Sequence, residues 1–254
     1  MNQADAIVNV WLESNDPKYP LDLRGLGLKR HPIIPSNVEI LYLNGNEIEV
    51  LFLPDSIRVL DVSNNFIEII HHLPTNLKEF YADNNIITSI AYFPKSLKYI
   101  KLCGNMLNVL PELPRMLKGL YVSNNKLKKS PIFPSSLRYI DISYNSITDC
   151  SALPKKLLYL WCHANNLKGI PDLPETLLGG TISHKNPLPI DEQQGSEFPQ
   201  IRGKAIQEYR CKLETIKMKK CKHVSDLCRE HIMKYCWNPE TELGRYLVLH
   251  ELND

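Results

Sequence analysis

The sequence predicts an α/β solenoid, a coil of short turns with a parallel β-sheet on its concave face and an extended convex face. One pattern of 20 residues repeats between Leu73 and Pro174. Its opening prolines are Pro74, Pro94, Pro114, Pro134, Pro154 and Pro174, and Pro35 and Pro54 extend the series upstream. Apolar residues and an asparagine recur at fixed offsets from each proline. A short, fixed period of this kind indicates a solenoid, in which each turn packs only on its neighbours.

The strand of each turn is marked by apolar residues six and eight positions after the proline, as at Ile100 and Leu102. Side chains alternate across a strand, so both should point into the core. With further apolar residues at offsets three and thirteen, the consensus is L-x-x-L-x-L-x-x-N-x-L, the leucine-rich repeat pattern. A Leu-Pro or Phe-Pro pair at each junction fixes φ and opposes helix, so the convex side should be extended or polyproline-like.

The asparagines lie eleven residues after each proline and should form a ladder along the coil: Asn46, Asn65, Asn85, Asn105, Asn125, Asn145 and Asn165. A solenoid turn leaves backbone groups beyond the reach of water, and an amide side chain both donates and accepts hydrogen bonds. After Pro174 the pattern loosens. Lys185 replaces the ladder asparagine, Asn186 comes one residue late, and Gly179 and Gly180 leave the strand without bulk. This segment should be the terminal turn.

Residues 1–20 are predicted to form an N-terminal capping helix, because Ala4, Ile7, Val8, Trp11 and Leu12 share one helical face and Pro17 ends it. The solenoid should span residues 21–190 in about nine turns. Its first turn is degenerate, with Leu26 where later turns have asparagine.

Residues 191–254 should form a helical C-terminal cap or tail. A polar linker at 191–198 precedes two amphipathic patterns, and Asn238-Pro239 suits the start of a third helix. These helices could cap the last repeats, which we favour, or form a small bundle.

The repeat, P-x-x-L-x-x-L-x-V-x-x-N-x-L-x-x-L-P, resembles the bacterial-type repeat of secreted effectors, the YopM-like proteins and the IpaH-type ubiquitin ligases. The segment LDLRGLGLKRHP is similar to their capping region. The resemblance covers roughly residues 5 to 190. The ligases add a large catalytic domain with a Cys-x-Asp motif, and no cysteine here is followed by that spacing. A similar repeat occurs in proteins of giant DNA viruses, whose composition the Asn, Ile, Lys and Tyr usage here would suit.

Composition does not name a partner, because the net charge is +2 and the hydrophobic content is 43%. No apolar run approaches the ~20 residues of a membrane span, and the N-terminus lacks the features of a signal peptide. The seven cysteines are an odd number without paired spacing, which favours a reducing compartment. We therefore expect an intracellular protein, in the cytoplasm of a host cell if it is viral.

An aromatic surface is the candidate binding site. Offsets five and seven should point outward from the strands, and from Tyr81 to Trp161 their aromatic residues alternate between the two offsets like a checkerboard. The predicted anchors are Tyr42, Tyr81, Tyr99, Tyr121, Tyr139, Tyr159 and Trp161. Exposed Tyr and Trp are enriched at interface hot spots. The alternative is cross-strand packing that only stiffens the sheet.

A basic row should flank the aromatic residues at offset four: Arg58, Lys78, Lys98, Lys118 and Arg138. Five like charges at strand spacing would suit an acidic partner. They could equally form a solvated edge that blocks strand pairing.

Other chemistry finds less support. The sequence shows no phosphate-binding loop and no nucleophile motif, so we expect no catalytic residue, no cofactor and no enzymatic activity. Cys221, His223, Cys228 and His231 lack a C-x2-C knuckle, and buried structural cysteines explain them better than zinc. The segment 202–222 is basic but has no nucleic-acid motif.

The sequence thus predicts a scaffold that binds another protein, acidic if the basic row takes part, through the concave face. Two alternatives stay open. One is an adaptor or effector whose helical tail recruits a second partner such as ubiquitin machinery. The other is a nucleic-acid-associated protein that acts through the basic segment 202–222.

Overall fold

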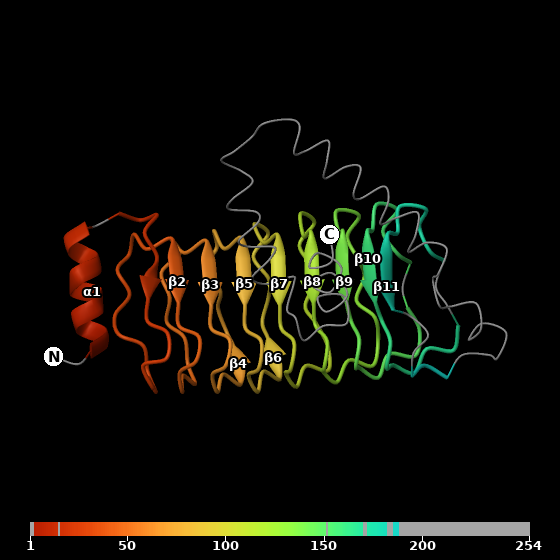
Figure 1. Cartoon of the computed structure of the whole chain (residues 1–254), viewed down its shortest axis with the longest axis horizontal. Coiled ribbons are helices and arrows are strands. Elements are labelled where there is room, and N and C mark those ends of the chain that lie inside the picture. The colour runs from red at the N-terminus through yellow and green to blue at the C-terminus, as the bar shows by residue number, and fades with distance from the viewer. Residues whose placement is uncertain (1–2, 15, 151, 170–171, 182–184, 188–254) are drawn as a thin grey trace, which may run out of the picture. The chain divides into compact units, whose positions relative to one another are not determined.

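The computed structural model describes residues 3–14, 16–150, 152–169, 172–181 and 185–187. One helix, α1 (Gln3–Ser14), precedes a row of short strands (Figure 1). Nine of them form one sheet in the order β1-β2-β3-β5-β7-β8-β9-β10-β11. Their bounds are β1 (Leu21–Asp22), β2 (Ile40–Tyr42), β3 (Val59–Asp61), β5 (Glu79–Tyr81), β7 (Tyr99–Lys101), β8 (Gly119–Tyr121), β9 (Tyr139–Asp141), β10 (Tyr159–Trp161) and β11 (Gly179–Thr181).

Every neighbouring pair in this sheet is parallel, and nine strands leave eight turns of chain between them. The register joins equivalent positions of successive repeats, as in the pairing of Ile100 with Leu120 and of Leu120 with Ile140. These central strand residues are fully buried, together with the leucines and isoleucines at the other apolar offsets. The chain is therefore a leucine-rich repeat solenoid with one continuous core.

The return segments between the strands are extended. Within the described residues they contain turns, bends and two short strands, β4 (Ile69–Ile70) and β6 (Ser89–Ile90), and no helix. These two strands pair in parallel as a separate sheet. Figure 1 shows them along one edge of the turns, away from the nine-stranded sheet.

The asparagine ladder joins each turn to the one before it. The side-chain amide of Asn125 donates to the backbone carbonyl of Leu102 at 2.8 Å, and its Oδ1 accepts from the backbone N–H of Leu107 at 3.0 Å. The same two bonds recur at the other six ladder positions: Asn46, Asn65, Asn85, Asn105, Asn145 and Asn165. Each ladder side chain thus satisfies backbone groups that the coil removes from water.

Asn186 is a further member of the ladder. The prediction that Lys185 occupies the ladder position of the last turn is therefore wrong. Its amide donates to the carbonyl of Cys162 at 3.0 Å, and its Oδ1 accepts from the N–H of Leu167 at 3.1 Å. The last turn has one additional residue between strand and asparagine, so the ladder position is displaced by one in sequence. Lys185, directly before Asn186, has a positive φ of 55°, and the residue before each of the other ladder asparagines also has a positive φ.

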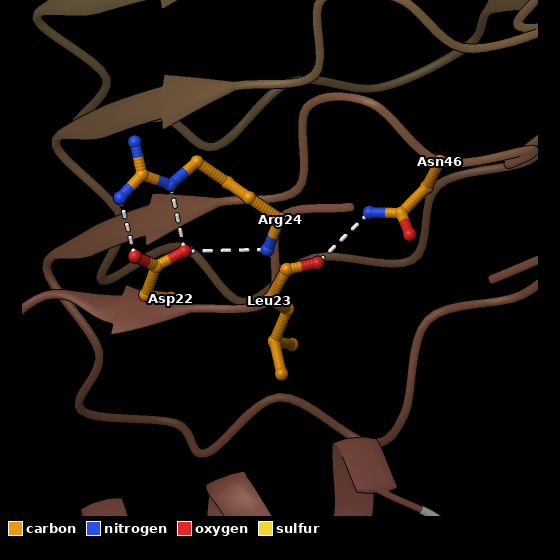
Figure 2. Close-up of polar contacts among 4 residues, drawn as sticks. All are labelled: Asp22, Leu23, Arg24 and Asn46. Atoms are coloured by element: carbon orange, nitrogen blue, oxygen red, sulfur yellow. Dashed lines mark hydrogen bonds and ion pairs between the residues drawn. The ribbon is translucent and has the colours of Figure 1, made fainter. Parts of the chain in front are cut away.

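The first turn has no ladder asparagine of its own, and Asn46 of the second turn bonds to it as each later asparagine bonds to the turn before it. Asn46 donates to the carbonyl of Leu23 (Figure 2). It also accepts from the N–H groups of both Leu26 and Leu28. Beside it, the Asp22 carboxylate accepts from the Arg24 backbone N–H and from its guanidinium, at 2.6 Å for the shorter side-chain bond. These contacts give the degenerate turn the shape of the later ones.

The residue before each ladder asparagine adopts a left-handed backbone. This position is occupied by Gly45, Asn64, Asn84, Gly104, Asn124, Tyr144, Ala164 and Lys185, all with positive φ. Glycine and asparagine enter this region with little strain, whereas other residues are disfavoured there. Tyr144 and Ala164 are therefore strained positions that the repeat geometry imposes.

The helix α1 contributes to the N-terminal end of the core, where β1 is the edge strand. Ala4, Val8 and Trp11 are buried in the same cluster as the first leucines of the solenoid. The Trp11 indole N–H also donates to the carbonyl of Tyr19 at 2.8 Å. Leu12, expected on the same face, is 45% exposed. It directly follows Trp11, so a helical turn directs it about 100° away from the buried stripe.

Within the described residues, the structure has no helix that is long and apolar enough to cross a membrane. The predicted helical tail at 191–254 and the boundary at residue 190 lie outside these residues.

Candidate protein-binding face

The first and third residues of each strand point away from the core and form what we call the sheet face. Alternation within the strands produces it, because the central residue is buried while its two neighbours are partly exposed in β2, β7, β9 and β10. All seven predicted aromatic anchors lie on this face. Six of them are half-buried, whereas Tyr81 is only 7% exposed.

Three aromatic residues near the C-terminal end form what we call the aromatic stack: Tyr139, Tyr159 and Trp161. The parallel register places Tyr139 directly beside Tyr159. Their ring centroids are 5.8 Å apart with planes 7° from parallel, and Tyr159 and Trp161 are 5.7 Å apart at 9°. Offset stacking of this kind is a favourable arrangement for aromatic rings. The stack is thus a half-exposed apolar surface held in one orientation.

Gly119 makes room for two of the tyrosines. A Cβ atom at this position would lie 2.9 Å from Cδ1 of Tyr99 and 3.1 Å from Cε2 of Tyr121. Both rings therefore cover the glycine, and any larger residue would displace them. The aromatic residues pack across strands as well as facing outward. The same side chains can therefore stiffen the sheet and offer a binding surface.

Lys101 lies between two of the aromatic rings. Its register partners are Tyr81 on one side and Tyr121 on the other. The Nζ atom is 5.6 Å from the Tyr81 ring centroid and 5.4 Å from that of Tyr121, within cation–π range of both. Tyr81 in turn donates its hydroxyl hydrogen to Glu79 Oε2 at 2.6 Å. Tyr81 is thus held by its neighbours, which accounts for its burial.

Three carboxylates lie on the same face, of which Asp61 is buried and Asp83 and Asp141 are half-buried. Burial raises the pKa of Asp61, Asp83 and Asp141, in the case of Asp83 to about 6. Hydrogen bonds oppose the rise: the N–H of Ser63 donates to Asp61, and the N–H of Cys103 donates to Asp83. The charge of Lys101 also lowers the pKa of both Asp61 and Asp83. The sheet face is therefore acidic at its centre, with one lysine among the carboxylates.

Asp141 has the same kind of aromatic neighbours as Lys101. Its register partners are Tyr121 and Trp161, and Tyr139 precedes it on the same side of β9. Its Oδ1 accepts from the Ser143 backbone N–H at 3.0 Å and from the Ser143 hydroxyl at 2.6 Å. These bonds fix the orientation of the carboxylate, whose strand position lies between those of Tyr121 and Trp161.

The basic row lies one residue before the strands, along one edge of the sheet face. Each member's backbone N–H bonds to the carbonyl of the previous member, at 2.7–2.8 Å from Lys78 to Arg138, so the five residues are adjacent in space. At the ends of the row, Arg58 pairs with Glu39 at 3.3 Å and Arg138 donates to the carbonyls of Ser136 and Leu137. Lys78 and Lys98 are half-buried, and Lys118 is exposed.

Asp61, Lys101 and Asp141 are the charged residues at the third strand position that the predicted site omitted. The signal was present, because aromatic and polar residues alternate strictly at the third strand position. Selecting only the aromatic members left out the charges between them.

The described residues contain no group of three or more His, Cys, Asp or Glu that could hold a metal ion. Cys103, Cys150 and Cys162 are free thiols, and burial raises the pKa of all three, in Cys150 to about 11. They are therefore poor nucleophiles at neutral pH. The candidate zinc residues Cys221, His223, Cys228 and His231, the basic segment 202–222 and the tail on which the adaptor alternative depends lie outside the described residues.

The repeat, the parallel sheet and the ladder make this chain a leucine-rich repeat solenoid, the architecture of many protein-binding proteins. Among solved structures it is similar to YopM from Yersinia enterocolitica, with 30% identity and a TM-score of 0.69 over 73% of this chain and 41% of that one. The chain thus spans less than half of the YopM chain.

Two further structures show the same fold at lower identity. A Shigella effector leucine-rich repeat domain has 23% identity and a TM-score of 0.57, over 78% of this chain and 84% of that one. The functional domain of InlJ from Listeria monocytogenes has 20% identity and a TM-score of 0.56, over 65% and 44%. No protein-family model and no curated protein matches the chain. The expected likeness to bacterial effector repeats is therefore supported, while a viral origin stays a prediction.

Proposed function

We propose that this chain binds another protein through the sheet face, without catalysing a reaction. The observation that supports this most is the aromatic stack, in which Tyr139, Tyr159 and Trp161 present half-exposed rings in one fixed orientation. Rigid Tyr and Trp side chains provide a large contact area at little entropic cost, which is why they dominate interface hot spots. The likeness to YopM, an effector protein, agrees with a binding role.

The proposed contact surface extends from the stack to the other half-buried aromatic residues, Tyr42, Tyr99 and Tyr121. We assign Tyr81 a supporting role instead, because it is buried and bonded to Glu79. The basic row beside these residues would guide an acidic region of the partner. Lys118, its most central exposed member, is the position where such an effect should be largest.

We place this function in an intracellular compartment, as the cysteine usage of the sequence predicts. The solenoid would act as a scaffold there, since its repeats offer one continuous surface rather than an enclosed pocket.

A capture experiment with a matched control tests the proposal. The full chain is immobilised and incubated with lysate, and captured proteins are identified and then confirmed as purified binary partners. The Tyr121→Ala/Trp161→Ala variant should lose a partner that the wild type retains. The control, Phe52→Ala/Ile132→Ala, removes two residues of the return segments that are 79% and 88% exposed. It should keep the partner.

Circular dichroism and thermal melting verify that both variants are folded. A purified partner that binds the folded Tyr121→Ala/Trp161→Ala variant as tightly as the wild type would contradict the proposal. The aromatic residues would then serve only to pack the sheet.

A further inference from the structure

We propose that the sheet face recognises a basic side chain, arginine or lysine, of an extended partner segment, and that this side chain lies over Asp141 between Tyr121 and Trp161. This inference rests on the proposed protein-binding function and specifies the chemistry of the partner. Three features support it: a cation already present at an equivalent position, the charge at Asp141, and the acidic residues of the central strands.

The chain itself contains a cation between two aromatic rings. Lys101 lies between Tyr81 and Tyr121, with its Nζ 5.6 and 5.4 Å from the two ring centroids. Tyr81 and Tyr121 are two strands apart, a separation of about 10 Å at the usual strand spacing. Two aromatic residues that are two strands apart in this sheet are therefore separated by a distance that lets a cation contact both rings.

Asp141 occupies the equivalent place two strands further on. Tyr121 and Trp161 are its register partners, so the aromatic pair is again separated by two strand spacings. A carboxylate stands here where Lys101 stands in the earlier turn. The Asp141 position thus combines two neighbouring aromatic residues with a negative charge. The Lys101 position has the same aromatic arrangement but carries its own positive charge.

The ionised form of Asp141 is held in place by donors. The Ser143 N–H and hydroxyl both bond to Oδ1, and interactions with Ser123 and His163 also favour the charged form. Desolvation by burial opposes it. A cation above the carboxylate would relieve this cost, because opposite charge within a few ångströms favours ionisation.

The surrounding face has the matching sign. Of the charged residues within the central strands, Asp61, Glu79 and Asp141 are acidic and Lys101 is basic, and the acidic Asp83 lies two residues after β5. Trp161, the best aromatic partner for a cation, lies at the stack directly beside Asp141. The basic row runs along the edge of this face, one residue before the strands. A fitting partner segment therefore has a basic side chain at its centre and acidic residues to one side.

The test uses a display library of random decapeptides, selected for binding to the wild-type full chain. Selected peptides are then measured individually by fluorescence polarisation, each with its key basic residue intact, replaced by norleucine and replaced by glutamate. Norleucine keeps the aliphatic length and removes the charge. We expect the norleucine version to bind about 5- to 30-fold more weakly, as cation–π and charge contributions of this size imply. The glutamate version should lose binding further.

The variant Asp141→Asn provides the critical comparison, because asparagine keeps the shape and the acceptor for Ser143. The difference between the basic and norleucine peptides should shrink several-fold in this variant. The matched control is Asp149→Asn, an exposed acidic residue outside the sheet. It should leave the difference unchanged. An undiminished difference in Asp141→Asn, or equal binding of the norleucine peptide to the wild type, overturns the inference.

The outcomes also separate this inference from the proposed function. Peptides that need the sheet face, as shown by loss of binding to Tyr121→Ala/Trp161→Ala, but have no preference for a basic residue would refute only the inference. Peptides that bind this double variant as well as the wild type would count against the proposed function itself. Self-association of the chain that competes with the peptides would instead identify a second copy as the occupant, and would also overturn the inference.

Discussion

The side-chain amide of Asn105 donates a hydrogen bond to the backbone carbonyl of Ala82, 2.9 Å away and 23 residues earlier in the chain. Its Oδ1 accepts from the N–H of Ile87 at 3.0 Å. One side chain thus satisfies a buried acceptor and a buried donor of the previous turn. This explains why the residue type is so regular along the solenoid.

Replacing this asparagine should destabilise the fold strongly. Asn105→Ala would leave both buried backbone groups without partners, at a cost of about 2–4 kcal/mol in the free energy of unfolding. Urea denaturation followed by circular dichroism measures it. The exposed Asn108→Ala is the matched control and should change the midpoint little. A similar stability for both variants would show that water replaces the ladder.

Gly119→Ala should disturb the sheet face more than the core. The new methyl group would lie 2.9 Å from Tyr99 and 3.1 Å from Tyr121, which is closer than ordinary van der Waals contact. Both rings must therefore move. We expect binding of a sheet-face partner to weaken at least several-fold while the melting temperature changes modestly. Gly169→Ala has no atom within 4 Å of the added carbon and serves as the control. Unchanged binding by a folded Gly119→Ala would show that Tyr99 and Tyr121 lie outside the contact.

Stability should fall as the pH rises through the range between about 4 and 6. Burial raises the pKa of Asp83 well above its usual range, to about 6. In this window the folded state binds more protons than the unfolded state, so raising the pH favours unfolding. A shift of about two units corresponds to at most about 3 kcal/mol. The pKa values of Asp61 and Asp141 are raised in the same direction and add to the trend.

The variant Asp83→Asn tests this assignment, because its amide oxygen can still accept the Cys103 N–H. Unfolding measured from pH 4 to pH 7.5 should show a flatter profile than the wild type and a gain in stability near neutral pH. Asp149→Asn, at an exposed site, should keep the wild-type profile. If the slope is the same in Asp83→Asn and the wild type, Asp83 is not the group responsible.

Ala164→Gly should stabilise the solenoid by up to about 1 kcal/mol. Ala164 has a φ of 51°, in the region that alanine disfavours and glycine enters freely. The relief of this strain should exceed the greater flexibility of glycine in the unfolded chain. Ala82→Gly, in the buried core, is the opposite control and should destabilise. Thermal melting of the two variants decides the matter, and a loss of stability at position 164 would contradict the strain argument.

Much of this architecture could be predicted from the sequence, because the period fixes the register. Leu120 is buried between Ile100 and Ile140 by the same 20-residue spacing that defines the repeat. The last turn was harder to predict. Counting eleven residues from Pro174 predicts Lys185 at the ladder position. In the structure Asn186, one residue later, makes the two ladder hydrogen bonds to the previous turn.

The candidate site was predicted less completely, since exposure depends on side-chain packing that spacing does not reveal. Tyr81 and Tyr121 occupy the same offset, yet Tyr81 is buried through its bond to Glu79 and its contact with Lys101. The left-handed backbone before each ladder residue was also missed. The glycines and asparagines at that position, Gly45, Asn64, Asn84, Gly104 and Asn124, were the available signal.

The alternation along the sheet face means that the structural and the chemical units of this protein differ in length. Twenty residues make one turn, but forty residues are needed before aromatic is followed by polar and then by aromatic again at the third strand position. Excision of one turn, residues 114–133, would preserve the backbone register and place Lys101 directly beside Asp141. Excision of two turns, residues 114–153, would place Lys101 beside Trp161 and keep the alternation. The backbone could therefore be shortened one turn at a time, whereas its surface pattern could be shortened only in pairs of turns.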